Sequence, residues 1–368
     1  MTTADDVAHM RAALALARRG LGRVWPNPAV GCVIVKDGAV VGRGWTQPGG
    51  RPHAETEALQ RAGAAARGAT AYVSLEPCCH HGRTPPCATA LIGAGVVRVV
   101  GALEDPDPRV SGSGFAALEA AGIAVTRGLL ADEAAELNAG FLMRVRAGRP
   151  LVTLKTATTL DGRIASHTGA SRWITGEAAR ARGHLMRGQH DAVMVGSRTA
   201  LLDDPELTCR LSGMAARSPV RIVADGHLRL PLTSRLVRSA RQTPTWVLVL
   251  PTTDAARRQA FRDCGVELVE VAADREGNLD LAAALTALGG RGLTRLMVEG
   301  GGHLAAALLR AGLVDRLAWF RAPALLGGDG VPAAAPFGID APDAAPRFVP
   351  EADVALGDDR LETYRVRR

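Results

Sequence analysis

Apolar positions in the first part of the chain change between helical and strand-like spacing. A helical pattern runs from Ala4 to Gly20, and two apolar runs, Val30–Val35 and Val40–Trp45, follow it. The two runs flank Asp37-Gly38, and an Asp-Gly pair between apolar runs is a strong hairpin signal. Strands and helices then alternate, with further strands expected at Val96–Ala102 and Ile123–Thr126. This order predicts an α/β sheet with helices on both faces.

The length of the chain predicts two domains. At 368 residues it is too long for one module of about 150 residues. Arg144 to Pro150, which includes Gly148, has the composition expected of a linker. We therefore expect one domain at residues 1–147 and a second at residues 148–368.

A histidine and two cysteines in the first domain have the composition of a catalytic zinc site. They occur in His53-Ala54-Glu55, in Pro77-Cys78 and at Cys87. One imidazole and two thiolates supply three ligands for a tetrahedral Zn²⁺ and leave its fourth position open to water. Glu55 lies two residues from the histidine, close enough to exchange protons with that water. The order His-x-Glu, Pro-Cys and Cys is typical of zinc deaminases that act on nucleobases.

Taken singly, each of these residues is also expected by chance in proteins without a zinc site. A lone His-x-Glu is common, and a free cysteine is more often a small core residue than a ligand. The local context favours the zinc interpretation, because Cys78 follows the apolar run Ala71–Leu75 and Cys87 opens the helical segment Cys87–Ile92. His53 likewise precedes a helical pattern. Thiolates are stabilised where a strand or loop leads into a helix N-terminus.

Three motifs taken together resemble a known enzyme family. They are Trp25-Pro26-Asn27-Pro28-Ala29-Val30-Gly31-Cys32, His53-Ala54-Glu55, and the stretch from Glu76 to Cys87 that contains His-His-Gly-Arg-Thr-Pro-Pro. They resemble the deaminase half of the bifunctional riboflavin-biosynthesis deaminase–reductases, in the cytidine-deaminase superfamily. The long insert between the cysteines distinguishes this family from ordinary cytidine and tRNA adenosine deaminases. Cys79 stands where many relatives have serine and could compete for zinc, although the family register favours Cys78 and Cys87.

The resemblance implies a mechanism and a substrate for the first domain. Zn²⁺ held by His53, Cys78 and Cys87 activates water, and Glu55 transfers its proton to the departing ammonia. The substrate in this family is a diaminopyrimidinone that carries a ribose 5′-phosphate. Positions that line the substrate pocket in the family match Asn27, His80 and Arg83. Asn27 could equally be a turn residue between two prolines, and Arg83 could be a solvated loop charge.

The second part of the chain resembles the reductase half of the same family. The motifs are a strand running into Leu160-Asp161-Gly162, then Ser171-Arg172-Trp173-Ile174-Thr175, Gly196-Ser197-Arg198-Thr199, the segment from Asp203 to Arg210, and the segment from Glu299 to Leu304. That half has a dihydrofolate-reductase-like fold. The fold class expected for the whole chain is therefore α/β, with an N-terminal cytidine-deaminase-like α/β/α domain and a C-terminal dihydrofolate-reductase-like α/β domain.

A glycine run suggests where a dinucleotide binds. Gly300 to Gly302 follow the apolar strand Arg295–Val298 and open the helix His303–Ala311, and such a loop lets backbone N–H groups approach a pyrophosphate. A flexible turn without a ligand is the alternative, because glycine-rich turns are weak evidence. By resemblance, the residues that contact NADPH are Ala157, Trp173, Thr199, Asp203, Gly301, Gly302, His303 and Leu304. Those that contact the substrate are Lys155, Ser171, Arg187, Leu207, Arg210 and Glu299.

Composition limits the partners and the compartment. No apolar run is long enough to span a bilayer, the N-terminus lacks a signal peptide, and six cysteines do not suggest a disulfide framework, so we expect a cytoplasmic enzyme with no membrane partner. A net charge of +7 could suggest nucleic acid. The arginines are scattered, however, and aromatic residues make up only 4% of the chain, so we expect no nucleic-acid partner. A homo-oligomer is suggested by the resemblance alone.

Two other functions compete with this interpretation. A nucleic-acid-editing deaminase with a basic accessory domain would bind RNA or DNA with a steep salt dependence. A zinc-stabilised binding module would need no acid near the metal, and the presence of Glu55 argues against it.

Overall fold

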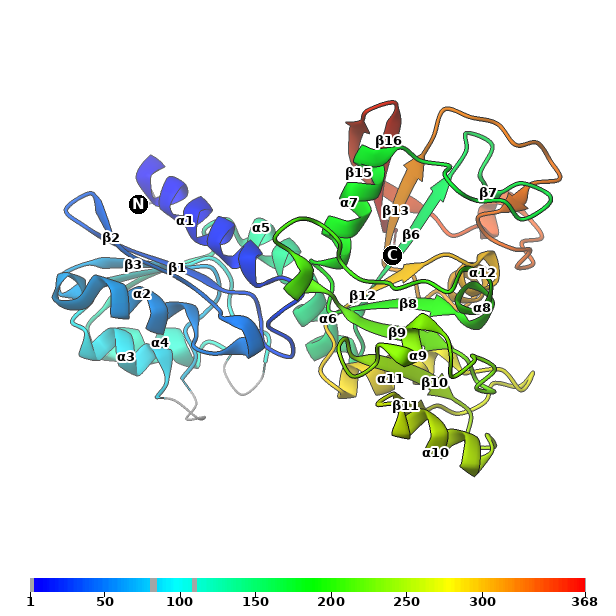
Figure 1. Ribbon diagram of the computed structural model, residues 1–368. Helices are drawn as coiled ribbons and strands as arrows, with labels where there is room; N and C mark the ends of the chain where they lie inside the picture. The colour runs from blue at the N-terminus through cyan, green and yellow to red at the C-terminus, as the bar shows by residue number, and fades with distance from the viewer. Residues whose placement is uncertain (1–2, 80–84, 108–110, 368) are drawn as a thin grey trace. The chain divides into compact units, whose positions relative to one another are not determined.

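The computed structural model describes residues 3–79, 85–107 and 111–367 (Figure 1). The chain divides into two compact units, Met1–Gly148 and Arg149–Arg368. Across the described ranges, none of the helices has the length and apolar character needed to cross a membrane.

The first unit is built on a five-stranded sheet with the order β2-β1-β3-β4-β5. Its strands are β1 (Gly31–Lys36), β2 (Ala39–Trp45), β3 (Thr70–Val73), β4 (Arg98–Gly101) and β5 (Ala124–Arg127). β1 and β2 form the expected hairpin, and Asp37 and Gly38 both have positive φ, 49° and 76°. Strands β3, β4 and β5 run parallel, as the alternation of strands and helices predicts.

Helices cover both faces of this sheet (Figure 1). The helices are α1 (Ala4–Ala17), α2 (Ala54–Ala62), α3 (Cys87–Gly93), α4 (Ser113–Ala120), α5 (Ala131–Leu137) and α6 (Ala139–Ala147). Successive side chains of β1 point to opposite faces, as in any strand: Cys32 and Ile34 pack with residues of α2, α3 and α4, whereas Val33 and Val35 pack with residues of α1 and α5. The α/β/α sandwich predicted for the N-terminal domain is therefore confirmed.

The expected linker is wrong in its extent. Residues 144–147, which the sequence assigns to the linker, form the last turn of α6. Gly148 then ends that helix in a left-handed conformation with φ of 68°, as glycine commonly does at this position. Arg149 already belongs to the second unit, where it makes two hydrogen bonds to Asp315, of 2.7 and 2.9 Å.

The second unit is built on a nine-stranded sheet with the order β11-β10-β9-β8-β12-β6-β13-β16-β15. The strands from β11 to β13 in this order are parallel, whereas β16 and β15 form an antiparallel hairpin at one edge. Their bounds are β6 (Leu151–Thr158), β8 (Ala192–Gly196), β9 (Val220–Ala224), β10 (Thr245–Val249), β11 (Glu267–Glu270), β12 (Arg295–Glu299), β13 (Arg316–Arg321), β15 (Phe348–Leu356) and β16 (Asp359–Val366). A separate short pair joins β7 (Arg163–Ala165) to β14 (Val331–Pro332).

Helices connect these parallel strands. They are α7 (Glu177–Arg187), α8 (Ser197–Asp203), α9 (Arg235–Arg238), α10 (Ala255–Asp263), α11 (Leu281–Gly290) and α12 (Gly302–Arg310). The carboxyl ends of β8, β9 and β12 meet at one edge of the sheet, and α8 and α12 begin there. In open α/β sheets this edge is where ligands bind.

Candidate functional site

His53, Cys78 and Cys87 form a cluster with the geometry of a zinc site. Their ligand atoms all lie within 4.8 Å of one another, and His53 Nδ1 lies 3.6 Å from Cys78 Sγ and 3.3 Å from Cys87 Sγ. Tetrahedral zinc bonds of about 2.0–2.3 Å place neighbouring ligand atoms roughly 3.5–3.8 Å apart. The three side chains are therefore already arranged to hold the ion, as the sequence predicts.

Local secondary structure brings these side chains together. His53 is the N-cap residue of α2, and Cys87 is the first residue of α3. Cys78 lies in the loop after β3, and its sulfur accepts a hydrogen bond from the backbone N–H of Cys87 at 3.4 Å. The helix positions inferred from the hydrophobic pattern are correct for His53 and Cys87, whereas Cys78 reaches the start of α3 from a loop.

Glu55 is the second residue of α2 and is only 3% exposed. Burial raises its pKa to about 7, although the His53 imidazole opposes this shift. A carboxyl group whose pKa lies near neutrality can both accept and donate a proton. Glu55 is thus suited to move a proton beside the metal cluster.

The thiol of Cys78 favours its ionised form. Hydrogen bonding with Cys87 and His53 lowers its pKa to about 4, despite its partial burial. The side-chain hydrogen bond with Cys78, together with burial, raises the pKa of Cys87. Zinc binding requires both sulfurs as thiolates, and the charge of Zn²⁺ would stabilise the second one.

Glu76 fixes the loop that carries Cys78, and sequence reasoning assigned it no role. It is buried, and its carboxylate accepts hydrogen bonds from backbone N–H groups of the described residues Asp105 (3.1 Å), Gly112 (2.9 Å), Gly114 (2.8 Å) and Phe115 (3.3 Å). A Cβ atom on Gly114 would lie 2.0 Å from the Pro77 carbonyl oxygen, so this position requires glycine. The sequence does contain a signal for this role, because an acidic residue stands directly before Pro77-Cys78.

The other residues expected to line the first site lie in different parts of the structure or outside the described residues. Asn27 lies in the loop before β1 and packs on Gly50, whose hypothetical Cβ would meet Asn27 Nδ2 at 1.9 Å. Cys79 is partly exposed beside Cys78, and the metal cluster comprises the other three residues. His80 and Arg83 lie outside the described residues.

In the second unit, one carboxylate joins two basic residues. Arg187 of α7 donates two hydrogen bonds to Glu299, from Nε at 2.6 Å and from Nη2 at 2.9 Å. Lys155 of β6 places Nζ 3.8 Å from Glu299 Oε2. Burial would raise the pKa of Glu299, but the two basic groups hold it at about 2. The predicted substrate residues Lys155, Arg187 and Glu299 thus form one ion cluster.

The same ion cluster holds the loop after α8. Arg187 Nη1 donates to the Thr208 carbonyl oxygen at 3.0 Å, and the ring of His184 contacts that oxygen at 3.1 Å. Arg210 is exposed, and its side chain pairs with Glu206. Leu207 has φ of 54° and is only 3% exposed, so its side chain belongs to the core and only its backbone is available to a ligand.

The glycine run has no space for side chains. Gly300 and Gly301 have φ of 68° and 80°, and a Cβ atom on Gly301 would lie 2.9 Å from Thr199 Oγ1. A Cβ atom on Gly302 would lie 2.8 Å from the Pro332 carbonyl oxygen. The loop between β12 and α12 therefore leaves backbone close to the edge of the sheet, as the pyrophosphate interpretation requires.

The other residues expected to contact NADPH or the substrate differ in how exposed their side chains are. Trp173 is 69% exposed, and the Arg180 guanidinium stacks 4.7 Å from its ring centroid. Ser171, Asp203 and His303 are exposed, Ala157 is half-buried in β6, and Leu304 is 9% exposed in α12.

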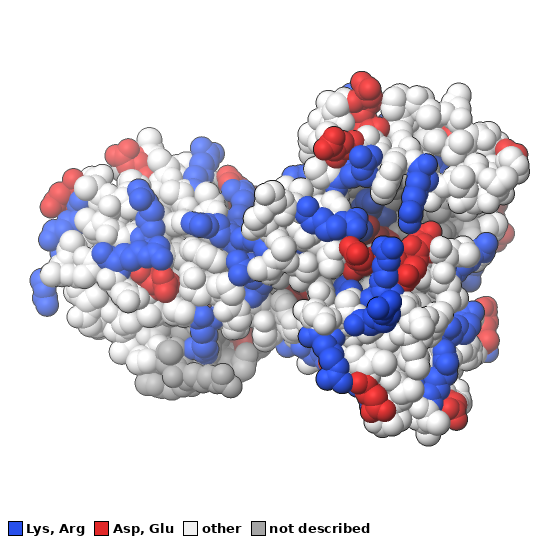
Figure 2. All heavy atoms as spheres, viewed as in Figure 1, with Lys and Arg blue, Asp and Glu red and all other residues white. Residues whose placement is uncertain are grey.

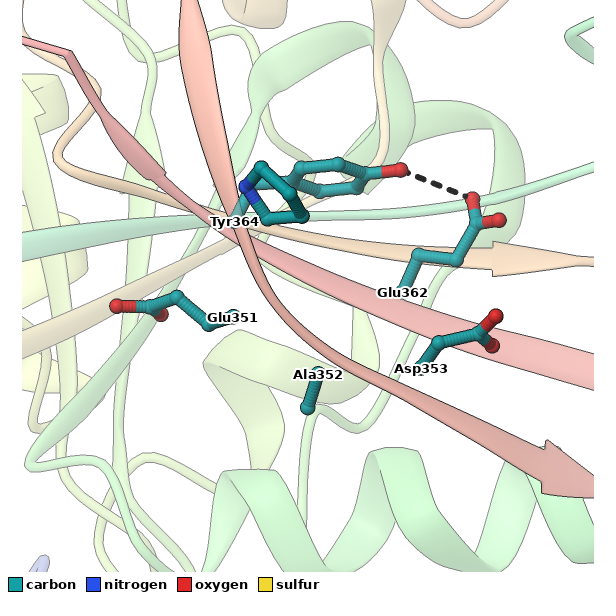
Figure 3. A pocket seen from close by; sticks show the side chains of 6 residues that line it. Glu351, Ala352, Asp353, Glu362 and Tyr364 are labelled. Carbon is teal, nitrogen blue, oxygen red and sulfur yellow. Dashed lines mark hydrogen bonds between the residues drawn. The ribbon is translucent and has the colours of Figure 1, made fainter.

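A shallow hollow on the β15–β16 hairpin has the wrong charge for a phosphorylated substrate. It is lined by Pro350, Glu351, Ala352, Asp353, Glu362 and Tyr364 (Figure 3). Three carboxylates line it, and each pairs with an arginine. Figure 2 shows basic and acidic side chains together over β6, β12, β13 and α7, with other charges dispersed over this face.

Comparisons with known proteins identify the family to which each unit is similar. Residues 3–103 match the family model of the cytidine and deoxycytidylate deaminase zinc-binding region, and residues 150–353 match the RibD C-terminal domain. The riboflavin biosynthesis protein RibD of Escherichia coli is 46% identical over 338 residues, which cover 88% of this chain and 89% of that protein.

Solved structures extend the similarity over the whole chain. Acinetobacter baumannii RibD has 38% identity and a TM-score of 0.89, with 99% of both chains covered. The Thermotoga maritima diaminohydroxyphosphoribosylaminopyrimidine deaminase/5-amino-6-(5-phosphoribosylamino)uracil reductase has 34% identity and a TM-score of 0.85, with 98% of this chain and 99% of that chain covered. The chain therefore belongs to the RibD family of riboflavin-biosynthesis enzymes, which join a zinc-dependent deaminase to an NADPH-dependent reductase in one polypeptide.

Proposed function

We propose that the first unit hydrolyses the ring amine of 2,5-diamino-6-(5-phosphoribosylamino)pyrimidin-4-one and that the second reduces the ribosyl group of the product to ribityl. The two catalytic domains would span residues 1–147 and 148–368. One observation carries the first half of this proposal. The three potential zinc ligands lie together, and the buried Glu55 lies two residues from His53.

The residues of the first unit have distinct roles in this proposal. His53, Cys78 and Cys87 would hold Zn²⁺, which when bound acts as a Lewis acid and lowers the pKa of water. Glu55 accepts a proton as water adds to the amine-bearing carbon, and it returns a proton to the departing amine. The balance is one water consumed and one ammonia released. Asn27, His80 and Arg83 would orient the pyrimidine and its phosphate.

The second unit needs to bind NADPH and the substrate and to place charged side chains near the ribose. NADPH, when bound, supplies the hydride. Glu299, Arg187 and Lys155 would lie beside the substrate, with Ser171, Leu207 and Arg210 completing its surroundings. The ion cluster supports this assignment because it places a cationic amine and a guanidinium where a phosphorylated, hydroxyl-rich ligand can accept hydrogen bonds. Ala157, Trp173, Thr199, Asp203 and Gly301 to Leu304 would contact the dinucleotide.

The partner is then a small phosphorylated pyrimidine rather than a nucleic acid. We also propose the cytoplasm as the compartment, because zinc thiolates at Cys78 and Cys87 require reduced sulfur. A homo-oligomer stays a proposal that sedimentation can test.

A coupled assay tests the proposed function. Zinc-loaded protein is given the phosphoribosylated diaminopyrimidinone and NADPH, and ammonia release and NADPH oxidation are followed separately. We expect one NADPH oxidised for each ammonia released, with ammonia appearing first. Ammonia release without NADPH oxidation would contradict the role given to the second unit.

A further inference from the structure

We infer that Asn138 is a positioning residue for deamination, which holds the segment that carries Asn27 and so sets the affinity for the pyrimidine substrate. This inference rests on the substrate role proposed for Asn27. It gives a function to a buried side chain that neither the sequence motifs nor the proposed mechanism uses.

Asn138 binds both backbone groups of one residue in that segment. Its Oδ1 accepts a hydrogen bond from the Ala29 N–H at 2.9 Å, and its Nδ2 donates to the Ala29 carbonyl oxygen at 3.1 Å. Asn138 is 109 residues from Ala29 along the chain, lies where α5 ends and α6 begins, and is only 3% exposed. Two contacts to one residue restrict both its position and its backbone orientation.

The next two backbone N–H groups are also held by buried side chains. The N–H of Val30 donates to Thr46 Oγ1 at 3.0 Å, and the N–H of Gly31 donates to Ser74 Oγ at 3.0 Å. Thr46 and Ser74 are 2% and 0% exposed. Three consecutive N–H groups, beginning with that of Ala29, therefore each bind a side chain from a different part of the chain. The backbone of this segment is fixed residue by residue.

The fixed segment leads directly to Asn27, beside the chain that carries a zinc ligand. Asn27 is two residues before Ala29 and packs on Gly50, where a Cβ atom would lie 1.9 Å from Asn27 Nδ2. Gly50 is three residues before His53, the N-cap residue of α2. The position of Ala29 thus determines how the Asn27 amide lies relative to the residues that precede His53.

Ser74 connects the other end of the segment to the loop of a second zinc ligand. It directly follows β3, four residues before Cys78, and its own N–H donates to the Gly31 carbonyl oxygen at 3.0 Å. The Gly31 end therefore stays attached if Asn138 is changed. Loss of the Asn138 amide leaves both backbone groups of Ala29 buried without these partners, which is unfavourable unless the segment moves. Asn27 is then displaced while the zinc ligands keep their own supports.

Ammonia release by the full-length, zinc-loaded protein tests this inference. Asn138→Leu keeps a side chain of similar size and removes both hydrogen bonds. We expect it to raise the KM for the phosphoribosylated diaminopyrimidinone about tenfold, the factor for a lost buried hydrogen bond. Zinc content should stay at the wild-type value, and kcat should change less than about threefold. Asn138→Ala leaves space for water beside Ala29 and should raise KM by a smaller factor.

A double variant tests whether Asn138 acts through Asn27. Asn27→Ala alone should raise KM, because it removes the proposed substrate contact. Adding Asn138→Leu to Asn27→Ala should raise KM less than about twofold further, since the effects of two residues that share one contact are not additive. Two effects that multiply would mean that Asn138 acts elsewhere and would overturn the inference.

Tyr72→Phe is the matched control. It removes another buried hydrogen bond of the first unit, from Tyr72 Oη to Asp6 Oδ1 at 2.7 Å, so it should lower Tm and leave KM unchanged. The same result in both Asn138 variants, lower Tm with a wild-type KM, would mean a purely structural role and overturn the inference while Asn27→Ala still raises KM. A wild-type KM in Asn27→Ala would instead remove the substrate role proposed for Asn27, and the inference with it.

Discussion

Lys155 and Glu299 are register partners in the adjacent parallel strands β6 and β12, with Lys155 Nζ 3.8 Å from Glu299 Oε2. Arg187 reaches the same carboxylate from α7 with two shorter hydrogen bonds. Three elements that are distant in the sequence therefore meet at one buried acid. This arrangement connects the stability of the second unit to the charge of its proposed substrate site.

Glu299 should make the stability of the second unit depend on pH. Its pKa is about 2 when folded, against an ordinary value of 4.5, because the basic groups outweigh burial. A depressed pKa stabilises the fold above pH 4.5 and loses that contribution as the pH falls toward 2. The difference corresponds to about 3 kcal/mol at roughly 1.4 kcal/mol per pKa unit. Denaturant unfolding at several pH values measures it.

Glu299→Gln should lower stability at neutral pH, because Arg187 stays buried without its counterion. The stability difference between this variant and the wild type should shrink between pH 4.5 and 2. Glu270→Gln is the control: Glu270 is exposed and pairs with Arg258, and its substitution should not alter the pH dependence of unfolding. A constant difference across this pH range would contradict the account of Glu299.

Glu76 should matter for zinc affinity although it does not touch the metal cluster. In Glu76→Gln, an NH₂ group replaces one oxygen and faces backbone N–H donors, so the loop carrying Cys78 loses part of its anchor. Losing such indirect support typically costs 10–100-fold in metal affinity. We expect a zinc Kd higher by about that factor in a chelator competition. Glu119→Gln changes an exposed acid and serves as the control, so it should leave the zinc Kd unchanged. A wild-type zinc Kd in Glu76→Gln would contradict the role given to Glu76.

The sequence could predict the zinc cluster because its signals are local. His53 and Cys87 stand at helix starts that the hydrophobic pattern marks, and the family motif supplies their order. The ion cluster itself was not predicted. The resemblance placed Arg187 and Glu299 only among the substrate contacts, because they are 112 residues apart and nothing in the spacing shows that they meet. Leu207 illustrates a further limit. The motif indicates a ligand contact, but only the fold shows that its side chain lies in the core.

Gly301→Asp should weaken NADPH binding. The new side chain would crowd Thr199 Oγ1 and bring a negative charge to the expected pyrophosphate. We expect the KM for NADPH to rise at least about tenfold, as a charged contact of 1.5–3 kcal/mol implies. Gly277→Asp is the matched control, since Gly277 has φ of 81° and open space around it. An unchanged KM in Gly301→Asp would place the cofactor elsewhere.

Zinc removal should separate the two activities. Chelation should abolish ammonia release, because three ligands without their ion cannot activate water. NADPH oxidation with the already deaminated substrate should stay within about twofold, since the ion cluster and glycine run belong to the other unit. Restored ammonia release on adding zinc serves as the control. Loss of both activities would mean that the metal supports more than the deaminase.

The most direct test of the account is Glu55→Gln, with zinc content, ammonia release and NADPH oxidation measured on the same preparation. We predict one zinc per chain as in the wild type, ammonia release reduced by at least about 10²-fold, the usual lower bound for losing an acid–base group, and undiminished reduction of the deaminated substrate. Loss of zinc would show that Glu55 supports the metal instead. Near-normal ammonia release would contradict its role as the proton carrier.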